Sequence, residues 1–225
     1  MLTWLRPGDR FPPVERSLSS PNGLLAAGGD LSPERLLDGY RRGIFPWFSE
    51  GQPILWWSPD PRMVLWCEDL KVPRSLAKSV RNKGFELRVD TAFEAVLAGC
   101  AEREEGTWLG PEMRAAYLSL HCAGHAHSFE TWRENELVGG LYGVALGRMF
   151  YGESMFSRTT DASKVALVHL VGHLRSKGFP LIDCQMHTAL LASLGAREIP
   201  RPDFLRALVP LVNYAEPPGA WTAGA

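Results

Sequence analysis

The chain has few cysteines and almost no net charge. Its four cysteines stand more than twenty residues apart along 225 residues, at Cys67, Cys100, Cys122 and Cys184. Because none of them has CxxC or CxH spacing, we expect reduced, mostly buried thiols rather than a disulfide framework or a zinc site. The net charge is only −1. The chain therefore has no overall positive field that would indicate binding to nucleic acid. A polyanion site would need a local cluster of basic residues.

Long apolar runs and familiar nucleotide motifs are also missing. No hydrophobic stretch approaches the roughly 20 residues that span a bilayer, and residues 1–16 mix charge and proline with apolar residues, unlike a signal peptide. We therefore expect a cytoplasmic protein with no membrane partner. GxSxG, P-loop and GxGxxG motifs are absent. Nothing indicates a covalent nucleophile, an ATP site or a bound cofactor.

One segment is dense in aromatic residues and proline. Residues 43–62 hold five aromatic residues and four prolines. Each proline removes a backbone donor and pushes its predecessor toward extended geometry, so we expect a stiff, irregular wall rather than a helix. Such a wall suits stacking of a nucleobase or an apolar side chain. The pattern leaves open a second interpretation, a domain junction whose tryptophans fill the core.

The pattern of turns and apolar residues predicts an α+β protein. Ser32 and Pro33 mark the start of a helix that reaches Gly43. Further on we expect strands at 63–66, 85–89, 127–133, 136–146, 148–156 and 180–184, and helices at 91–101, 111–123 and 161–177 and near 189 and 204. Short turns between the central strands favour antiparallel pairing. We expect a small N-terminal domain, residues 1–60, and a mixed-sheet domain, residues 61–225.

The histidines do not make a convincing metal site. His169 and His173 are four residues apart on a predicted helix, but Leu170 stands where an HExxH motif has glutamate. A second group crosses a helix end into a strand, so its side chains would diverge: His121, His125 and His127. We expect no metal.

Three polar residues at strand ends are candidates for chemistry. Glu153 interrupts an apolar strand, and Asp183 and Gln185 flank Cys184, so that strand alternation would place both on one face. A buried or cleft-lining acid is costly unless it is paired, which makes each acid either a site residue or part of a structural hydrogen-bond network or helix cap.

Several sequence blocks resemble one family. They run in order from residue 21 to about 200 and include Gly28-Gly29-Asp30-Leu31-Ser32-Pro33, Gly43-Ile44-Phe45-Pro46-Trp47-Phe48, Trp56-Trp57-Ser58-Pro59-Asp60-Pro61-Arg62, Gly152-Glu153-Ser154-Met155-Phe156-Ser157-Arg158 and Ile182-Asp183-Cys184-Gln185. Together they look like the leucyl/phenylalanyl-tRNA–protein transferase family.

This resemblance implies a fold and a reaction. The fold would be a small N-terminal domain beside a domain similar to the GNAT-type acyl-CoA N-acyltransferases. The enzyme would transfer Leu, Phe or Met from aminoacyl-tRNA to the α-amino group of proteins that begin with Arg or Lys, which marks them for N-degron proteolysis. An aminoacyl ester is already activated, so such an enzyme needs mainly to align the amine and the carbonyl. We expect it to act as a monomer.

The resemblance also implies roles for individual residues. Trp47 would stack on the terminal adenine of the tRNA, with Trp108 close to it. The donor side chain would lie in a pocket lined by Leu141, Phe150, Met155 and Leu167 and bordered by Tyr117. Asp183 and Gln185 would act on the attacking amine, with Glu153 nearby. Because a neutral amide is a very weak base, we expect Gln185 to orient the amine and Asp183 to stabilise the ammonium or attract the acceptor's basic residue.

A cluster of basic residues has two interpretations. Only Glu86 opposes six positive side chains in eighteen residues: Lys71, Arg74, Lys78, Arg81, Lys83 and Arg88. They could contact tRNA phosphates without reading sequence, or they could be an ordinary solvated helix face.

The chain departs from the family at one position, and two rival functions stay open. Leu190 stands where family members usually have histidine, with His187 three residues earlier. Two interpretations stay open: His187 replaces that histidine from another position, or the family histidine serves only packing. One rival function is a non-catalytic tRNA- or peptide-binding module, which would not need Asp183 and Gln185 together. The other is a coenzyme A-dependent acyltransferase, which needs a glycine-rich turn where residues 157–161 read Ser-Arg-Thr-Thr-Asp.

Overall fold

The N-terminal part of the chain forms a small sheet backed by one helix. The computed structural model describes residues 2–102, 107–215 and 221. The sheet has the order β1-β2-β4-β3, and its strands are β1 (Thr3–Leu5), β2 (Leu24–Gly28), β3 (Phe45–Pro46) and β4 (Leu55–Trp57). Helix α1 (Pro33–Arg41) begins as predicted, because the Ser32 hydroxyl accepts a hydrogen bond from the Arg35 amide and Pro33 occupies the first turn.

The aromatic segment is more regular than predicted. Its two halves, β3 and β4, pair antiparallel with Phe45 opposite Trp57. The expectation of a wholly irregular wall was therefore wrong. The prolines allow this pairing, because Pro46 is the last residue of β3 and β4 contains no proline.

The rest of the chain forms a seven-stranded mixed sheet. Its order is β11-β5-β10-β9-β8-β7-β6, and its strands are β5 (Arg62–Trp66), β6 (Glu86–Val89), β7 (Ala126–Arg133), β8 (Glu136–Leu146), β9 (Met149–Ser157), β10 (Leu181–Gln185) and β11 (Arg197–Ile199). Strands β7, β8 and β9 are antiparallel, as their short turns predicted. The turn at Glu134 and Asn135 has positive φ at both residues, as a tight hairpin requires. Strand β10 runs parallel to β9, which makes the sheet mixed.

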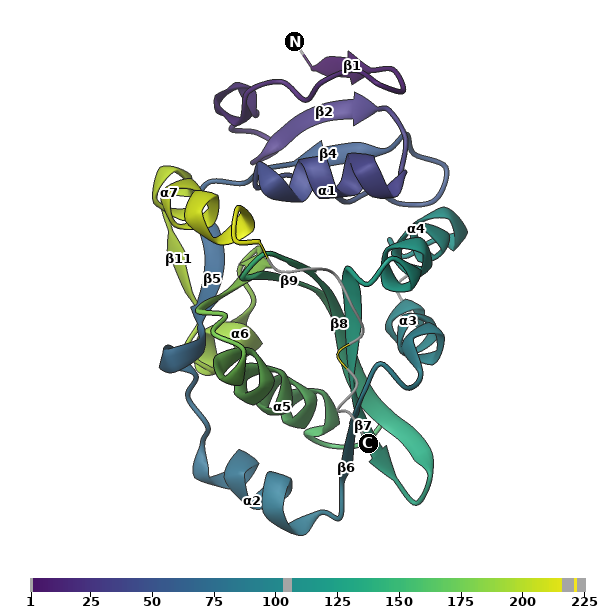
Figure 1. The fold of residues 1–225 in the computed structure, drawn as a ribbon, viewed down its shortest axis with the longest axis vertical. Coiled ribbons are helices and arrows are strands. Elements are labelled where there is room, and N and C mark those ends of the chain that lie inside the picture. The colour runs from purple at the N-terminus through teal and green to yellow at the C-terminus, as the bar shows by residue number, and fades with distance from the viewer. Residues whose placement is uncertain (1, 103–106, 216–220, 222–225) are drawn as a thin grey trace.

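Helices cover both faces of this sheet (Figure 1). They are α2 (Arg74–Asn82), α3 (Phe93–Ala101), α4 (Pro111–Cys122), α5 (Ala162–Ser176), α6 (Ala189–Ser193) and α7 (Arg201–Val212), with 3-10 turns η1 (Val14–Arg16) and η2 (Cys67–Asp69). Helix α5 packs on β7, β8 and β9 from one face, and α3 and α4 pack from the other. Alternation along β8 therefore sends Leu141 toward α5 and Tyr142 toward α3 and α4.

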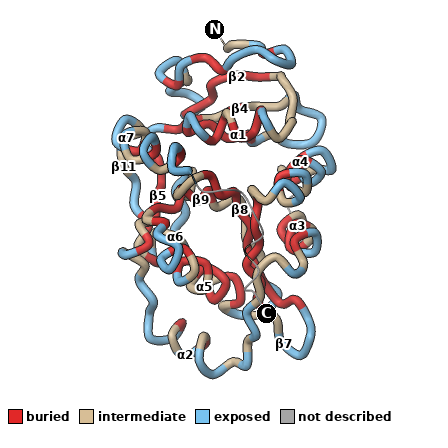
Figure 2. Tube along the Cα trace, in the orientation of Figure 1, coloured by how far each residue is buried: buried red, intermediate tan, exposed pale blue. Residues whose placement is uncertain are grey.

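A single apolar core joins the small sheet to the large one. Trp56 of β4, Val64 of β5 and Tyr151 of β9 belong to the same buried cluster. The Tyr151 hydroxyl donates to the backbone oxygen of Tyr40, 2.7 Å away. Figure 2 shows the buried residues concentrated in the central strands and in α5. The predicted α+β fold with a mixed sheet is confirmed, whereas the small N-terminal sheet was not predicted. In the part of the chain that the structure describes, no helix has the length and apolar character to cross a membrane.

Candidate functional site

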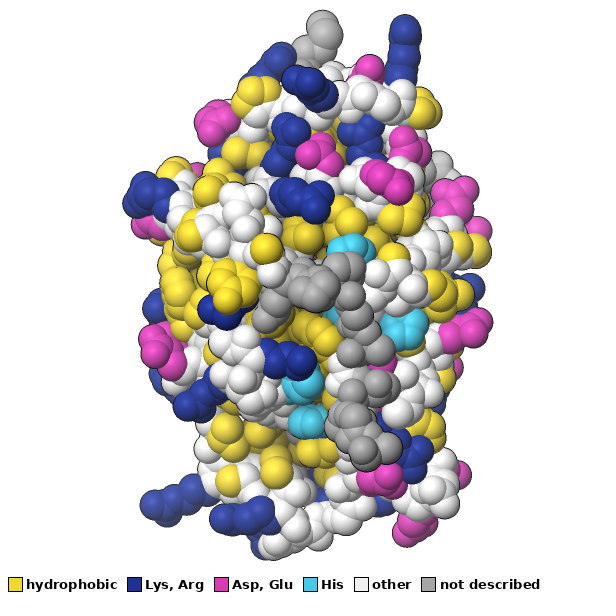
Figure 3. Space-filling view, viewed as in Figure 1, with side chains coloured by type: hydrophobic (Ala, Val, Ile, Leu, Met, Phe, Trp, Pro, Cys, Tyr) yellow, Lys and Arg dark blue, Asp and Glu magenta, His cyan; other side chains and the backbone are white. Residues whose placement is uncertain are grey.

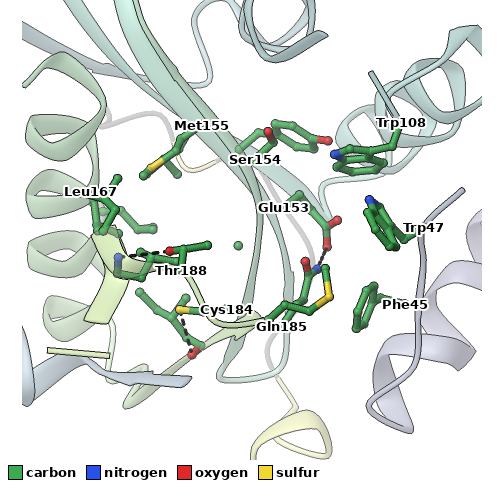
Figure 4. Close-up of a pocket in the computed structure, with 18 of the residues that line it drawn as sticks. Phe45, Trp47, Trp108, Glu153, Ser154, Met155, Leu167, Cys184, Gln185 and Thr188 are labelled. Atoms are coloured by element: carbon green, nitrogen blue, oxygen red, sulfur yellow. Dashed lines mark hydrogen bonds between the residues drawn. The ribbon is translucent and has the colours of Figure 1, made fainter. Parts of the chain in front are cut away.

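A cavity of about 400 Å³ lies where the two sheets meet. That volume is within the usual range for small-molecule pockets. Its walls come from β3 and the residue after it, from β8, β9 and β10, and from α5 and α6. The lining residues are Phe45, Pro46, Trp47, Trp108, Leu141, Tyr142, Gly152, Glu153, Ser154, Met155, Leu167, Leu170, Ile182, Cys184, Gln185, Met186, Thr188, Leu190 and Leu191. Figure 4 shows Met155 and Leu167 on one side of it and Trp47, Trp108 and Glu153 on the other.

The side with Met155 and Leu167 is apolar. Leu141 from β8, Met155 from β9 and Leu167 from α5 line it, as predicted for a donor pocket. Two residues predicted for the same pocket lie outside its lining. Phe150 is fully buried, one layer away, and Tyr117 is fully buried behind Glu153. The structure therefore places Leu141, Met155 and Leu167 in the lining of the cavity and Phe150 and Tyr117 outside it.

Trp47 and Trp108 line the opposite side of the cavity. Within the aromatic segment, one tryptophan is exposed and another belongs to the core. Trp47 is 39% exposed and packs edge-on against Trp57, with 5.6 Å between ring centroids. The Trp57 indole donates to the Trp47 backbone oxygen over 2.6 Å, which fixes the backbone that carries Trp47. Trp108 packs edge-on against Tyr117. Trp56, in contrast, is fully buried and donates to the Gly28 backbone oxygen.

Glu153 is the acid at the cavity wall. Its carboxylate accepts hydrogen bonds from the hydroxyls of Tyr40 and Tyr117, at 2.8 and 2.7 Å, and from the Gln185 amide nitrogen at 3.0 Å. Burial raises the pKa of Glu153 to about 7, although the three hydrogen bonds oppose the shift. Within the described residues no cation forms an ion pair with it. Near neutral pH this carboxyl is therefore partly ionised, and its ionised form can attract a positively charged ligand.

Asp183 lies beneath the site and not in its lining. Both of its carboxylate oxygens bind the Arg62 guanidinium, at 2.8 and 2.6 Å, and both side chains are fully buried. Arg62 also donates to the Gly43 backbone oxygen and lies over the rings of Phe45 and Phe204. This pair therefore ties the aromatic segment, β5, β10 and α7 together at one point.

The predicted alternation between Asp183 and Gln185 was wrong. The pairing of β10 with β5 shifts between these residues, so that Asp183 opposes Val64 while Gln185 opposes its neighbour Met63. Gln185 also has a positive φ of 62°. A bulge of this kind redirects a side chain. It sends Gln185 to the cavity and to Glu153, while its backbone amide donates to Asp183.

Two residues that organise the site were missed in the sequence. Tyr40 holds Glu153 from α1, and Arg62 neutralises Asp183. Neither has a motif that signals its role, although Arg62 closes the aromatic segment. Leu190, at the position of the expected family histidine, lines the cavity, whereas His187 is exposed and lies outside the lining.

The basic cluster lies at the end of the molecule away from the small sheet. Arg74, Lys78 and Arg81 are exposed on α2, and Lys and Arg side chains protrude at that end in Figure 3. Lys71, just before the helix, is also exposed. Lys83 instead binds the Thr160 backbone oxygen and lies 3.6 Å from Asp161, and Arg88 pairs with Glu86.

The fold and site define a class of enzyme. An apolar cavity beside a stacking surface, with an uncompensated carboxylate at its wall, suits an acyl-transfer enzyme that works by positioning two substrates. Among the described residues, no group of three His, Cys, Asp or Glu side chains could hold a metal ion.

Comparison with known proteins identifies the family. Residues 64–209 match the model of leucyl/phenylalanyl-tRNA protein transferase, and residues 29–60 match the model of its N-terminal domain. Curated relatives named leucyl/phenylalanyl-tRNA–protein transferase include one from Chromobacterium violaceum, 61% identical over 98% of this chain and 96% of that protein. Another, from Thiobacillus denitrificans, is 64% identical over 94% of each. The chain belongs to the leucyl/phenylalanyl-tRNA–protein transferase family and is a transferase.

A solved structure shows a weaker likeness. A GCN5-related N-acetyltransferase from Kribbella flavida aligns over 70% of this chain and 57% of that chain, with a TM-score of 0.39 and 13% identity.

Proposed function

We propose that the protein transfers Leu, Phe or Met from aminoacyl-tRNA to the α-amino group of proteins that begin with Arg or Lys. The product would carry the bulky N-terminal residue of an N-degron. The observation that carries this proposal is the arrangement of Glu153: an uncompensated carboxylate between an apolar pocket and two accessible indoles. We also propose that the enzyme acts as a monomer in the cytoplasm.

The donor fits the apolar side of the cavity. Leu141, Met155 and Leu167 offer no charge to the donor side chain, and a pocket of this kind separates apolar side chains only weakly, by about 1–3 kcal/mol per methylene. Met155 adds tolerance because a thioether side chain adapts its shape. Trp47, partly exposed and held by Trp57, would stack on the terminal adenine, with Trp108 near the same group.

The acceptor amine would lie against Glu153 and Gln185. Because the amide nitrogen of Gln185 is engaged by Glu153, its amide oxygen is left to accept a hydrogen bond from the attacking amine. Glu153 would attract the acceptor's positive charge and stabilise the ammonium that forms as the amine attacks the ester carbonyl. Asp183, neutralised by Arg62, would act as a positioning residue through the Gln185 backbone amide.

One assay tests the whole proposal. The protein is incubated with tRNA carrying labelled Phe and with a peptide that begins with Arg, beside the same peptide N-acetylated. We expect label only in the peptide with a free amine. Absence of label in both peptides would favour the non-catalytic binding module, and transfer from an acyl-coenzyme A instead would favour the other rival.

The basic residues of α2 give a second, separate test. If Arg74, Lys78 and Arg81 contact tRNA phosphates, reversing these three charges lowers the slope of log affinity against log salt by about 0.7–0.9 per lost contact. The reversal of Arg6, Arg10 and Arg16 in the small N-terminal unit is the matched control. An unchanged slope in the α2 variant would identify these residues as an ordinary solvated helix face.

A further inference from the structure

Next to the donor cavity, the side chain of Trp221 fills a slot lined by rings. Its indole stacks on the imidazole of His127, with centroids 3.9 Å apart and planes within 4°. Four more rings and one ammonium group surround it: Phe129, Phe150, His173, Phe179 and Lys177. Its backbone amide donates to Asp90, which also binds His127. Histidine side chains are visible in the middle of this face in Figure 3.

Two phenylalanines separate this slot from the donor cavity. Phe129 pairs directly with Leu141, and Phe150 pairs directly with Ile182; both partners line the cavity. Side chains of directly opposed residues point to the same face of a sheet. The rings of Phe129 and Phe150 therefore stand on the cavity's face of the sheet, in contact with its lining, and both also contact Trp221.

Helix α5 forms a wall common to both spaces. Leu167 and Leu170 line the cavity, whereas His173, one turn further along the same face, packs against the indole of Trp221. The slot and the cavity are thus neighbours along α5, and the rings of Phe129 and Phe150 form the partition between them.

The partition depends on Trp221 for its support. Phe129 and Phe150 are fully buried. The described residues around the indole offer few polar partners: among them, the Nε2 atoms of His127 and His173 are buried without a hydrogen-bond partner. Burial also lowers the pKa of His173 to about 4, so this ring is neutral at physiological pH. Removing a large buried ring leaves a space into which its neighbours relax only in part.

We propose that Trp221 is a positioning residue that sets the depth of the donor cavity by supporting Phe129 and Phe150, and thereby sets the preference between Leu and Phe donors. This inference rests on the proposed function. Without the indole, the two rings move toward the empty slot and the cavity deepens. A deeper cavity gains contacts with the longer Phe side chain and loses them with Leu.

The test measures donor preference in the full-length chain. The ratio of kcat/KM for Phe-tRNA to that for Leu-tRNA is determined for the wild type, Trp221→Ala, Trp221→Phe and the control Trp4→Ala, which removes an indole that is 68% exposed at the far end of the molecule. We expect the ratio to rise about threefold to tenfold in Trp221→Ala, to return toward the wild-type value in Trp221→Phe, and to stay unchanged in Trp4→Ala.

Each alternative outcome is informative. An equal loss with both donors, or no change in the ratio, would overturn the inference, because it would reduce Trp221 to a stabilising role or to none. If Trp221→Ala does not fold, Trp221→Leu is measured in its place. If the wild type transfers neither donor, the proposed function fails by itself. In that case the role of Trp221 is tested by binding. The ratio of dissociation constants for 3′-amide analogues of Phe- and Leu-adenosine is compared between the wild type and the Trp221 variants, and we expect the same shift in preference toward Phe.

Discussion

Two acids on neighbouring strands, Glu153 of β9 and Asp183 of β10, are held in opposite ways. Asp183 is fully buried and forms a two-pronged ion pair with Arg62. Glu153 lies at the cavity wall and, among the described residues, accepts hydrogen bonds from two tyrosine hydroxyls and an amide without a paired cation. Gln185 connects them, since its backbone binds Asp183 and its side chain binds Glu153.

The difference shows which acid can act on a substrate. The charge of Asp183 is already neutralised, and a buried pair of this kind is costly to break because the remaining partner keeps an uncompensated charge. The charge of Glu153 is stabilised by hydrogen bonds alone, and its pKa is raised to about 7 by burial. We infer that Asp183 maintains the framework and that Glu153 meets the acceptor, although the sequence presents both as similar candidates.

The largest expected effect is on stability, at Asp183. Asp183→Asn leaves the Arg62 guanidinium buried without its counterion, so we expect a loss of about 3–5 kcal/mol in the free energy of unfolding, measured by urea denaturation. The control is Asp203→Asn, which removes one partner of an exposed ion pair with Arg206 and should change stability by less than about 1 kcal/mol. If the two variants lose equal free energy of unfolding, the structural role assigned to Asp183 is contradicted.

The next effect is on activity, at Glu153. Glu153→Gln keeps the shape of the side chain but removes its charge, and we expect kcat/KM for a peptide beginning with Arg to fall on the order of tenfold to a hundredfold. Asp183→Asn, assayed at a temperature where it remains folded, should lose much less kcat. If Asp183→Asn loses more turnover than Glu153→Gln, the roles assigned to the two acids are reversed.

The stability of the wild type should also depend on pH through Glu153. Its pKa is about 7 in the folded protein and about 4.5 in the unfolded chain, so the folded state holds more protons between these values. The free energy of unfolding contributed by this group is therefore highest below about pH 4.5 and falls as pH rises through 7. In Glu153→Gln this contribution disappears, and the difference between the variant and the wild type should grow from pH 5 to pH 8. A flat difference would contradict the raised pKa.

The smallest expected effect comes from the tyrosines that hold Glu153. Each hydroxyl lowers the pKa of Glu153, so Tyr40→Phe or Tyr117→Phe should raise it further above 7. We expect the acidic limb of the pH profile of kcat/KM to move upward by less than about one unit, with a stability cost of about 1 kcal/mol. Tyr214→Phe, at an exposed tyrosine that does not line the cavity, is the control. If the acidic limb moves equally in the control, the pH profile of kcat/KM does not report the ionisation of Glu153.

Much of the fold was predictable because its signals are local. The cap at Ser32, the turn at Glu134 and Asn135, and the apolar runs of β8 and β9 each specify an element through neighbouring residues. Strands β1, β2, β3, β4 and β11 were missed. Strand β1 has three residues and one partner, so little in its own sequence sets it apart from a loop.

The site was predictable in its residues and less so in its geometry. Leu141, Glu153, Met155, Leu167 and Gln185 all line the cavity, as the resemblance implied. The role of Asp183 depends on Arg62, 121 residues away in the chain, and the direction of Gln185 depends on a bulge. Local periodicity predicts neither an ion pair between distant residues nor a shift of strand register.

The sequence alone determined the fold class and the family, because composition, caps, turns and family motifs are properties of neighbouring residues. Only the tertiary structure decided which acid carries an uncompensated charge, which tryptophan faces the cavity and which is core, and that the indole of Trp221 packs against Phe150. These outcomes depend on burial and on contacts between residues far apart in the chain, and burial sets the free energy of a charge.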